Sequence, residues 1–443
     1  MKTEPTSPQH PSPQDRSSTW LRSAALADGR VVDVEIDRTT GTIASVLPAR
    51  REVPRDAHAA PPVRAGNNHT DVDLEGYLLL PAPVEPHAHL DKALTAEFLP
   101  NERGDLLGAM EVWGPYIPQI TIADTVERAR RATLELLCSG VTAVRTHVNV
   151  QTGLGLKAME ALLTVRDELS DLIDMQIVAL VGLPLTGSDG AEHRALVTEA
   201  LRMDPVIIMG GCPHLDTDPD RATDFALELA GSTGRMLDLH TDETLDPSHL
   251  DLAYLSRRVI ETGFEQLTAA SHCVSLAMQP VDVQGAVAAQ VAEAKISVIT
   301  LPQTNLFLQG RNHPQSAPRG LTAIRPLLSA GVNVAAGADN VRDPFNSMGR
   351  SDPLETAALL VMAGHLLPNE AYKLISSGGR RAMGLAPVEI EPGAPAELLA
   401  VLGGSLADAV ARADQQRMVW HRGVLVASTA VQRNVGPGQA LRL

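Results

Sequence analysis

Apolar strand-like segments alternate with helical segments over the middle of this chain, and this alternation constrains the fold more than any other feature. The intervening stretches are rich in Ala, Leu, Glu and Arg at helical spacing, for example Asp124–Ser139 and Val281–Ala294. Eight strand–helix units predict an α/β protein built as a (β/α)8 TIM barrel, and a doubly wound open sheet is the alternative. The eight strands are Tyr77–Val84, Val141–His147, Met175–Leu180, Val206–Gly210, Met236–His240, Leu267–His272, Ile296–Leu301 and Val332–Gly337.

The two ends of the chain have a different texture, with short strand-like pieces separated by turn signals. One such region runs from Leu21 to about Leu80, and the other surrounds His421-Arg422-Gly423. We therefore expect residues 19–80 and 388–443 to pair into a small discontinuous β-sandwich, and residues 81–387 to form the barrel. Residues 1–18, rich in Pro, Ser and Gln, are expected to be a disordered tail and not a signal peptide.

Composition limits the partners of the chain. It has 37 Lys and Arg against 53 Asp and Glu, a formal charge of −16, and no basic run, so binding to nucleic acid or to an anionic membrane surface is not expected. No window approaches 18 uninterrupted apolar residues. The three cysteines form no CxxC pair, which favours a reducing, cytoplasmic compartment. These features indicate a protein that acts on a small molecule.

Titratable side chains stand where several predicted strands end. His87 and His89 follow the first strand one residue apart, and side chains at i and i+2 of a strand point to the same side. His240, His272 and Asp339 end the fifth, sixth and eighth strands. In a (β/α)8 barrel these ends meet at one rim, and imidazole and carboxylate groups are ligands of zinc and similar metals. The joint pattern predicts a metal site.

Each group also has an ordinary explanation when taken alone. A single HxH is a weak signal, Asp242-Glu243 is a common helix start, and Asp339-Asn340 is a common turn. His147 is expected to be a hydrogen-bonded rim residue. Lys92 is expected to be a solvated or salt-bridged loop residue. Cys273 is interpreted as a packed small side chain, because no separate base is evident for it.

Several phrases together resemble the amidohydrolase superfamily, and within it the bacterial cytosine deaminase-like group. The resemblance extends from about Ala82 to Ser428. The phrases are Val84-Glu85-Pro86-His87-Ala88-His89-Leu90-Asp91, Arg145-Thr146-His147-Val148, Gln176-Ile177-Val178-Ala179, His240-Thr241-Asp242-Glu243, Ser271-His272, Asn305-Leu306-Phe307-Leu308-Gln309-Gly310-Arg311 and Gly337-Ala338-Asp339-Asn340-Val341-Arg342-Asp343-Pro344-Phe345.

The resemblance implies one divalent metal ion, Zn²⁺ or Fe²⁺, with His87, His89, His240 and Asp339 as ligands. Binuclear members of the superfamily use a carboxylated lysine at the end of the fourth strand, and the run 205–211 has no lysine. A mononuclear site is therefore favoured. Members of this superfamily often form multimers, so a homo-oligomer remains open.

The same resemblance implies a hydrolytic mechanism. Asp339 would accept a proton from the attacking water, and Glu243 would protonate a ring or leaving nitrogen. His272 would hydrogen-bond the oxygen of the tetrahedral intermediate. A metal-binding protein without turnover is the competing class, but a purely structural metal site needs no such proton shuttle.

Two departures from true cytosine deaminases bear on the substrate. Their pyrimidine-reading glutamine is replaced here by Gly182, and their second aspartate after the metal aspartate is replaced by Asn340. An amide both donates and accepts hydrogen bonds, whereas a carboxylate only accepts. Phe345 is expected to stack on a planar ring, with Gln303 and Asn305 supplying replacement hydrogen bonds.

The sequence therefore predicts hydrolysis of a C–N bond, with release of ammonia or an amine, on a planar nitrogen heterocycle or cyclic amide other than cytosine. The asparagine pattern also resembles triazine-ring amidohydrolases such as those acting on N-isopropylammelide. The alternatives are a ring-opening cyclic amidohydrolase, as in hydantoinase-like members, and a cytosine or pyrimidine deaminase with an altered pocket.

Overall fold

Eight parallel strands form a barrel at the centre of the protein. The computed structural model describes residues 18–49 and 71–432. Each barrel strand pairs with the next in chain order. The barrel closes where Ala88 bridges to Asp339, whose backbone N–H donates to the His87 carbonyl at 3.1 Å. The predicted TIM barrel is confirmed, and the open-sheet alternative is wrong. The strands are β6 (Glu85–Ala88), β7 (Ala143–Val150), β8 (Asp174–Val181), β9 (Ile208–Gly211), β10 (Leu237–Thr241), β11 (Thr268–His272), β12 (Ser297–Thr300) and β13 (Val334–Ala336).

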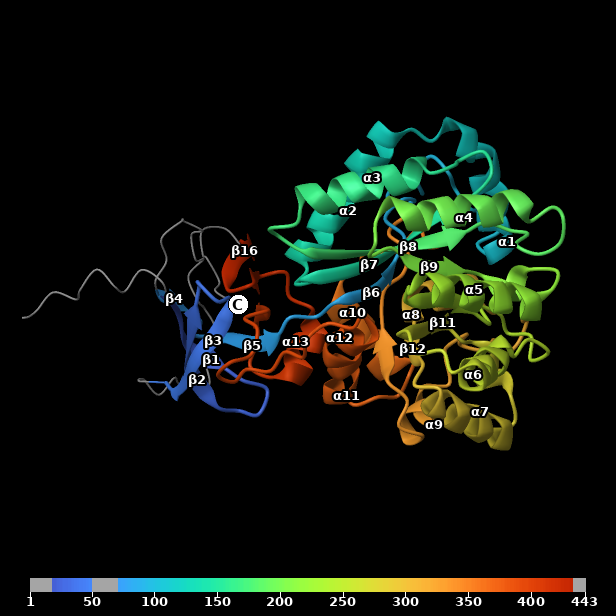
Figure 1. Ribbon diagram of the computed structural model, residues 1–443. Coiled ribbons are helices and arrows are strands. Elements are labelled where there is room, and N and C mark those ends of the chain that lie inside the picture. The colour runs from blue at the N-terminus through green and yellow to red at the C-terminus, as the bar shows by residue number, and fades with distance from the viewer. Residues whose placement is uncertain (1–17, 50–70, 433–443) are drawn as a thin grey trace, which may run out of the picture.

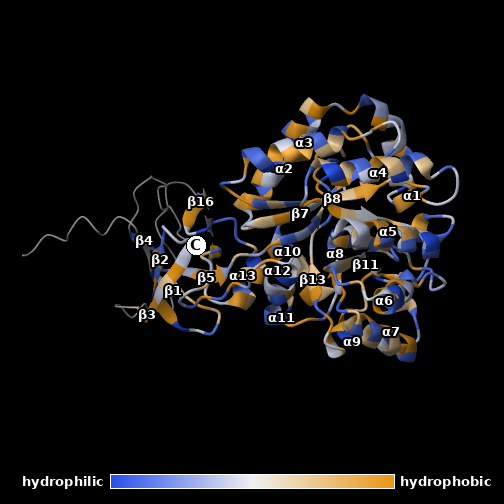
Figure 2. Ribbon diagram, viewed as in Figure 1, coloured by the Kyte–Doolittle hydropathy of each residue, from blue (hydrophilic) through white to orange (hydrophobic). Residues whose placement is uncertain are grey.

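Helices surround the barrel (Figure 1). Their sequences carry local start and stop signals. The Asp218 side chain accepts from the Arg221 N–H at the start of α5, and Gly234 ends that helix at a φ of +66°. Figure 2 shows hydrophobic and hydrophilic residues interspersed along helices such as α2 and α3, as expected for helices with one face on the core. The helices are α1 (Leu106–Trp113), α2 (Ile122–Cys138), α3 (Lys157–Glu168), α4 (Ala191–Met203), α5 (Pro219–Thr233), α6 (Asp251–Thr262), α7 (Val281–Glu293), α8 (Pro302–Leu308), α9 (Ile324–Ser329), α10 (Pro353–Met362), α11 (Pro368–Lys373), α12 (Gly379–Ala382) and α13 (Leu406–Arg412).

A second, mixed sheet lies beside the barrel and contains strands from both ends of the chain (Figure 1). Its strand order is β16-β15-β14-β5-β1-β2-β3, and β4 also pairs with β1. Apolar residues of both ends, including the fully buried Trp420, share a separate core. The predicted pairing of the two chain ends is confirmed. The strands are β1 (Ser18–Ala25), β2 (Val31–Asp37), β3 (Thr42–Pro48), β4 (Asp71–Asp73), β5 (Tyr77–Pro81), β14 (Leu398–Leu402), β15 (Arg417–His421) and β16 (Val424–Thr429).

One predicted strand is assigned to the wrong sheet. The run Tyr77–Val84 was expected to be the first barrel strand, but β5 takes most of it into the mixed sheet, antiparallel to β14. The barrel begins only at Glu85. Pro81 and Pro83 have no N–H to donate to a ladder, and they separate the two strands. An apolar run alone does not show which sheet it joins.

The expected disordered tail lies outside the described residues, except for Ser18, which begins β1. The exact domain boundaries stay predictions. Within the described residues, no helix is both long and apolar enough to cross a bilayer.

Candidate active site

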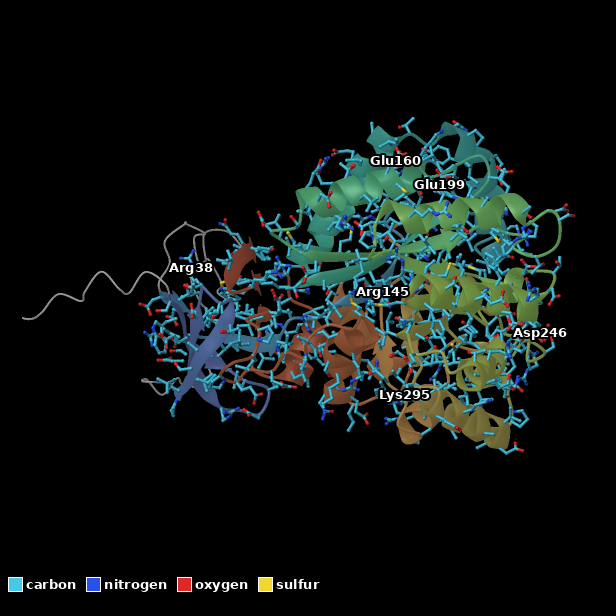
Figure 3. The ribbon with its side chains drawn as sticks, in the orientation of Figure 1. Arg38, Arg145, Glu160, Glu199, Asp246 and Lys295 are labelled. Carbon is cyan, nitrogen blue, oxygen red and sulfur yellow. The ribbon has the colours of Figure 1, made fainter. Side chains whose placement is uncertain are left out.

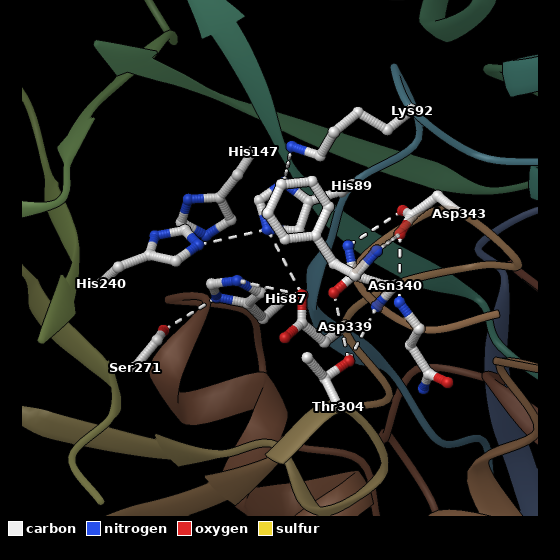
Figure 4. A network of polar contacts seen from close by, with 12 residues as sticks. His87, His89, Lys92, His147, His240, Ser271, Thr304, Asp339, Asn340 and Asp343 are labelled. Carbon is white, nitrogen blue, oxygen red and sulfur yellow. Dashed lines mark hydrogen bonds and ion pairs between the residues drawn. The ribbon is translucent and has the colours of Figure 1, made fainter. Parts of the chain in front are cut away.

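Four histidines and one aspartate converge at the carboxyl ends of the barrel strands, and Figure 4 shows four of them, His87, His89, His240 and Asp339. His87 and His89 come from the end of β6, His240 from β10, His272 from β11 and Asp339 from the turn after β13. All five are buried. The Nε2 atoms of His89 and His240 lie 3.1 Å apart. Asp339 Oδ1 lies 3.3 Å from His89 Nε2 and 3.7 Å from His87 Nε2, and Oδ2 lies 3.9 Å from His272 Nε2.

The backbone leaves its strand conformation where these side chains are presented. Asp242, His272 and Asp339 have φ values of 52°, 68° and 70°. This left-handed region is unfavourable for residues with a side chain, and such strain is common at functional sites. The side chains of His272 and Asp339 reach the cavity at the barrel mouth, whereas the Asp242 carboxylate accepts from the Asp251 and Leu252 N–H groups at the start of α6.

The buried polar atoms of this cluster fit a divalent metal ion. His87 Nε2 and both carboxylate oxygens of Asp339 have no hydrogen-bond partner. Burial lowers the pKa values of His87, His89 and His240, so these imidazoles are neutral and able to bind a metal. Unpartnered acceptors facing one another in a buried site are costly unless a cation lies between them. The cluster is therefore a metal site of the kind found in amidohydrolases, and its donor set of nitrogen and oxygen suits zinc or iron.

Glu243 and His272 lie next to the proposed ligands. Burial raises the pKa of Glu243 to about 8, and the Lys92 ammonium opposes this shift. Glu243 Oε1 lies 3.6 Å from His272 Nδ1. That same nitrogen is 3.0 Å from the Asn305 Oδ1 atom, which can only accept, so it carries the proton. His272 Nε2 then faces Asp339 without a partner.

A cavity of about 250 Å³ opens beside the cluster. Phe345 and Trp113 give it aromatic surface, and the Lys92 ammonium lies 5.3 Å and 5.9 Å from the centres of these two rings. Glu243, His272, Asp339 and Asn340 also reach the cavity. It therefore combines apolar walls for a flat molecule with titratable groups at one end.

The predicted substrate-binding residues divide into two groups. Gly182, Asn340 and Phe345 line the cavity. Gln303 and Asn305 are buried but are not among its lining residues. The Gln303 amide donates to Thr356 Oγ1 at 2.7 Å, and Asn305 holds His272. The geometry therefore favours positioning roles for these two amides.

Sequence reasoning missed three residues of the site. Lys92 was expected to be solvated or salt-bridged, and it is buried, with Nζ 3.0 Å from both His89 Nδ1 and Asn149 Oδ1 and 4.0 Å from Asp91 Oδ1. His147 stacks on His87 with ring centres 3.9 Å apart. Gln151 lines the cavity. The position of Lys92, three residues after His89, was the available signal, but its burial depends on contacts distant in sequence.

The fold and the site together define a TIM-barrel hydrolase with a buried metal centre. Comparison with known proteins agrees: a family model described as the amidohydrolase family matches residues 185–427. A pterin deaminase of Rhizobium rhizogenes is 30% identical over 363 residues, which is 80% of this chain and 82% of that protein. The chain belongs to the amidohydrolase family and is an enzyme that acts on C–N bonds.

Two solved structures show the same architecture over nearly the whole chain. A 5-methylcytosine deaminase from Klebsiella pneumoniae, liganded with 5-fluorocytosine, has a TM-score of 0.81 at 28% identity and covers 95% of this chain and 100% of its own. An N-isopropylammelide isopropylaminohydrolase from Burkholderia multivorans has a TM-score of 0.76 at 26% identity and covers 93% and 98%. This chain is therefore similar to metal-dependent amidohydrolases and deaminases that act on heterocycles.

Proposed function

We propose that this enzyme hydrolyses a C–N bond on a planar nitrogen heterocycle other than cytosine and releases ammonia or an amine. One observation carries the proposal: Glu243, His272 and Asp339 meet at the metal-binding cluster beside a cavity with aromatic walls. His87, His89, His240 and Asp339 would hold one ion, Zn²⁺ or Fe²⁺. When bound, this ion supplies Lewis acidity, which brings the pKa of a coordinated water toward neutrality.

The side chains divide the proton transfers among them. Asp339 accepts a proton from the attacking water, since its carboxylate faces the centre of the cluster without a partner. Glu243 donates a proton to the ring or leaving nitrogen, a role suited to a carboxyl whose pKa is raised to about 8. His272, whose Nδ1 proton is held by Asn305, presents Nε2 as an acceptor for the hydroxyl group that forms on the attacked carbon.

A second set of contacts favours a ring that carries a carbonyl acceptor. Lys92 Nζ donates to Asn149 Oδ1, and an ammonium has three donors, so Lys92 can also donate to the substrate. Both polar ends of the Asn340 amide are already engaged, with Thr304 donating to Oδ1 and Nδ2 donating to Asp343. Asn340 therefore forms part of the cavity wall, and its role is to shape the cavity more than to hydrogen-bond the substrate.

Gln151 takes over the role of the missing glutamine in this proposal. A Cβ atom added to Gly182 would lie only 2.5 Å from Gln151 Cβ and 2.9 Å from His193 Nε2, so position 182 has no room for a side chain. Gln151 fills that space and lines the cavity. Its amide makes no side-chain hydrogen bond to any described residue. It is therefore free to bind the edge of a substrate, as Gln303 and Asn305 were expected to do.

The test is a screen of pyrimidines, triazines, pterins and cyclic ureas on metal-loaded enzyme, with separate detection of ammonia, amine and linear carboxylate. Release of ammonia or an amine from one of the aromatic rings is the expected result. Efficient, selective conversion of cytosine to uracil would refute the inference that Gly182, in place of a glutamine, excludes cytosine as the substrate. That result would favour a pyrimidine deaminase. A linear carboxylate product would favour the ring-opening alternative.

Small molecules are thus the proposed partners, and nucleic acid or membrane surfaces are not. The cytoplasm is the proposed compartment, since Cys138, Cys212 and Cys273 are all free thiols. A homo-oligomer remains an expectation from the family resemblance.

A further inference from the structure

Four buried side chains form a continuous polar chain beneath the metal-binding cluster. His87 Nδ1 lies 2.8 Å from Ser271 Oγ, which donates to Asp238 Oδ1 at 3.3 Å. Arg145 Nη1 donates to Asp238 Oδ2 at 2.7 Å. These residues lie on β6, β11, β10 and β7, and each is at most 1% exposed. Figure 4 shows Ser271 beside His87, and Figure 3 labels Arg145 near the middle of the molecule, away from residues such as Glu160.

The chemistry of these groups fixes the direction of every hydrogen bond. A guanidinium only donates, so Asp238 faces Arg145 as an acceptor. The carboxylate also accepts the Ser271 hydroxyl proton. Ser271 Oγ can then only accept from His87, so His87 Nδ1 carries the ring proton. The lone pair of His87 therefore lies on Nε2, the unpartnered atom that faces Asp339.

We propose that Arg145, Asp238 and Ser271 are positioning residues that hold His87 in the tautomer able to bind the metal ion. The proposal rests on the assignment of His87 as a ligand, and it adds three residues that never touch the substrate. Among the described residues, no acceptor holds the Nδ1 atom of either of the other two proposed histidine ligands. His89 Nδ1 contacts Lys92, and His240 Nδ1 has no partner. A histidine ligand held through its other nitrogen is the usual arrangement at protein metal sites.

A second ion held by His87, His147 and Asp238 is the competing explanation, since their donor atoms lie within 4.8 Å of one another. The contacts argue against it. Both Asp238 oxygens already accept hydrogen bonds, and the Arg145 guanidinium would repel a dication at that position. His87 and His147 are stacked face to face, with an interplanar angle of 28°, so an ion in their planes would not be shared. We therefore expect one ion per chain.

The decisive variant is Ser271→Ala, compared with Ser297→Ala as a matched control. Ser297 is also a buried serine on a barrel strand, but its hydroxyl bonds Asn333 and not a metal ligand. Zn²⁺ affinity is measured on metal-free protein by competition with a chromophoric chelator, and bound zinc is counted. We expect the affinity of Ser271→Ala to fall about 10- to 100-fold, with the control close to wild type. Equal affinities for the two variants would overturn the proposal.

A second readout needs neither metal nor substrate. In metal-free protein with ¹⁵N-labelled histidine, the ring nitrogens of His87, assigned by the loss of signals in His87→Gln, should show a proton on Nδ1. The Ser271→Ala spectrum should show both tautomers, and Ser271→Thr, which keeps the hydroxyl, should restore the single form. A proton on Nε2 in the wild type would refute the proposal, as would equal loss of zinc affinity in Ser271→Thr and Ser271→Ala. Failure of the heterocycle screen would leave these outcomes unchanged, so the two proposals fail separately.

Discussion

Replacing Glu243 with glutamine should abolish activity while stabilising the metal-free protein at alkaline pH. Glutamine keeps the shape of the side chain but cannot deliver a proton, so loss of a general acid should lower kcat about 100- to 10,000-fold. The stability effect comes from burial, which raises the pKa of Glu243 from 4.5 to about 8. Between these values the unfolded chain has released the proton and the folded chain still binds it.

The sign follows from this difference in bound protons. Where the unfolded state binds fewer protons, the free energy of unfolding falls as pH rises, here from about pH 4.5 to about pH 8. Each pH unit between the two pKa values changes the free energy of unfolding by about 1.4 kcal/mol. At about pH 9, Glu243→Gln should therefore raise the free energy of unfolding of the metal-free protein by at most ~5 kcal/mol. At pH values below 4.5 the two proteins should differ little through this group.

Urea unfolding of chelator-treated wild type and Glu243→Gln, from about pH 5 to about pH 9, measures this difference. Burial also raises the pKa of Glu85 to about 8 and that of Asp339 to about 7, so only the difference between the two proteins isolates Glu243. A difference that does not grow with pH would refute the assignment of a buried, protonated Glu243. Unchanged turnover in Glu243→Gln would remove Glu243 from the mechanism.

Three further predictions test the metal site, the cavity and the packing of the two sheets. His240→Gln should lose bound zinc, as measured by elemental analysis, together with activity, and full activity in the metal-free variant would contradict a metal mechanism. Gln151→Ala should lower kcat/KM about 10- to 100-fold on the substrate found by screening, because one hydrogen bond to the ring is lost, and an unchanged value would return that role to other amides. Arg417→Met should lower the free energy of unfolding in urea by about 3–5 kcal/mol, because it leaves the Asp352 carboxylate buried without its bidentate partner. The exposed ion pair of Arg350 is the control for Arg417, with a loss of at most about 1 kcal/mol in Arg350→Met.

The sequence predicted both the barrel and the group of residues at its mouth, because both follow from the order of strands and helices along the chain. The residues of that group are His87, His89, His240, His272 and Asp339. Strand–helix alternation identifies the fold class, and a parallel barrel brings all strand ends to one rim. The first barrel strand was misplaced because periodicity does not identify the partner of an apolar strand. An apolar run that ends in prolines can be the end of a strand in either sheet.

The inner contacts of the site were not predictable from the sequence in the same way. Lys92 was expected to be solvated or salt-bridged, and its burial depends on Asn149, a neighbour 57 residues away that the sequence does not pair with it. The exclusion of a side chain at Gly182 likewise depends on Gln151 and His193. Resemblance predicts which residues a site of this family contains, and packing decides which of them reach the cavity.

The mixed sheet contributes to the site only indirectly, because no residue of its strands lines the 250 Å³ cavity. It contacts the segments next to the first and last barrel strands. β5 ends at Pro81, with three residues between it and the start of β6, and the Tyr372 hydroxyl donates to the Pro81 carbonyl at 2.8 Å. On the other side, Arg417 of β15 holds Asp352, which caps α10 after the segment that carries Asp339. The first and last barrel strands, which bring His87 and Asp339 together, are thus both tied to one sheet formed by the two ends of the chain. A displacement of that sheet would therefore separate metal ligands that it never touches.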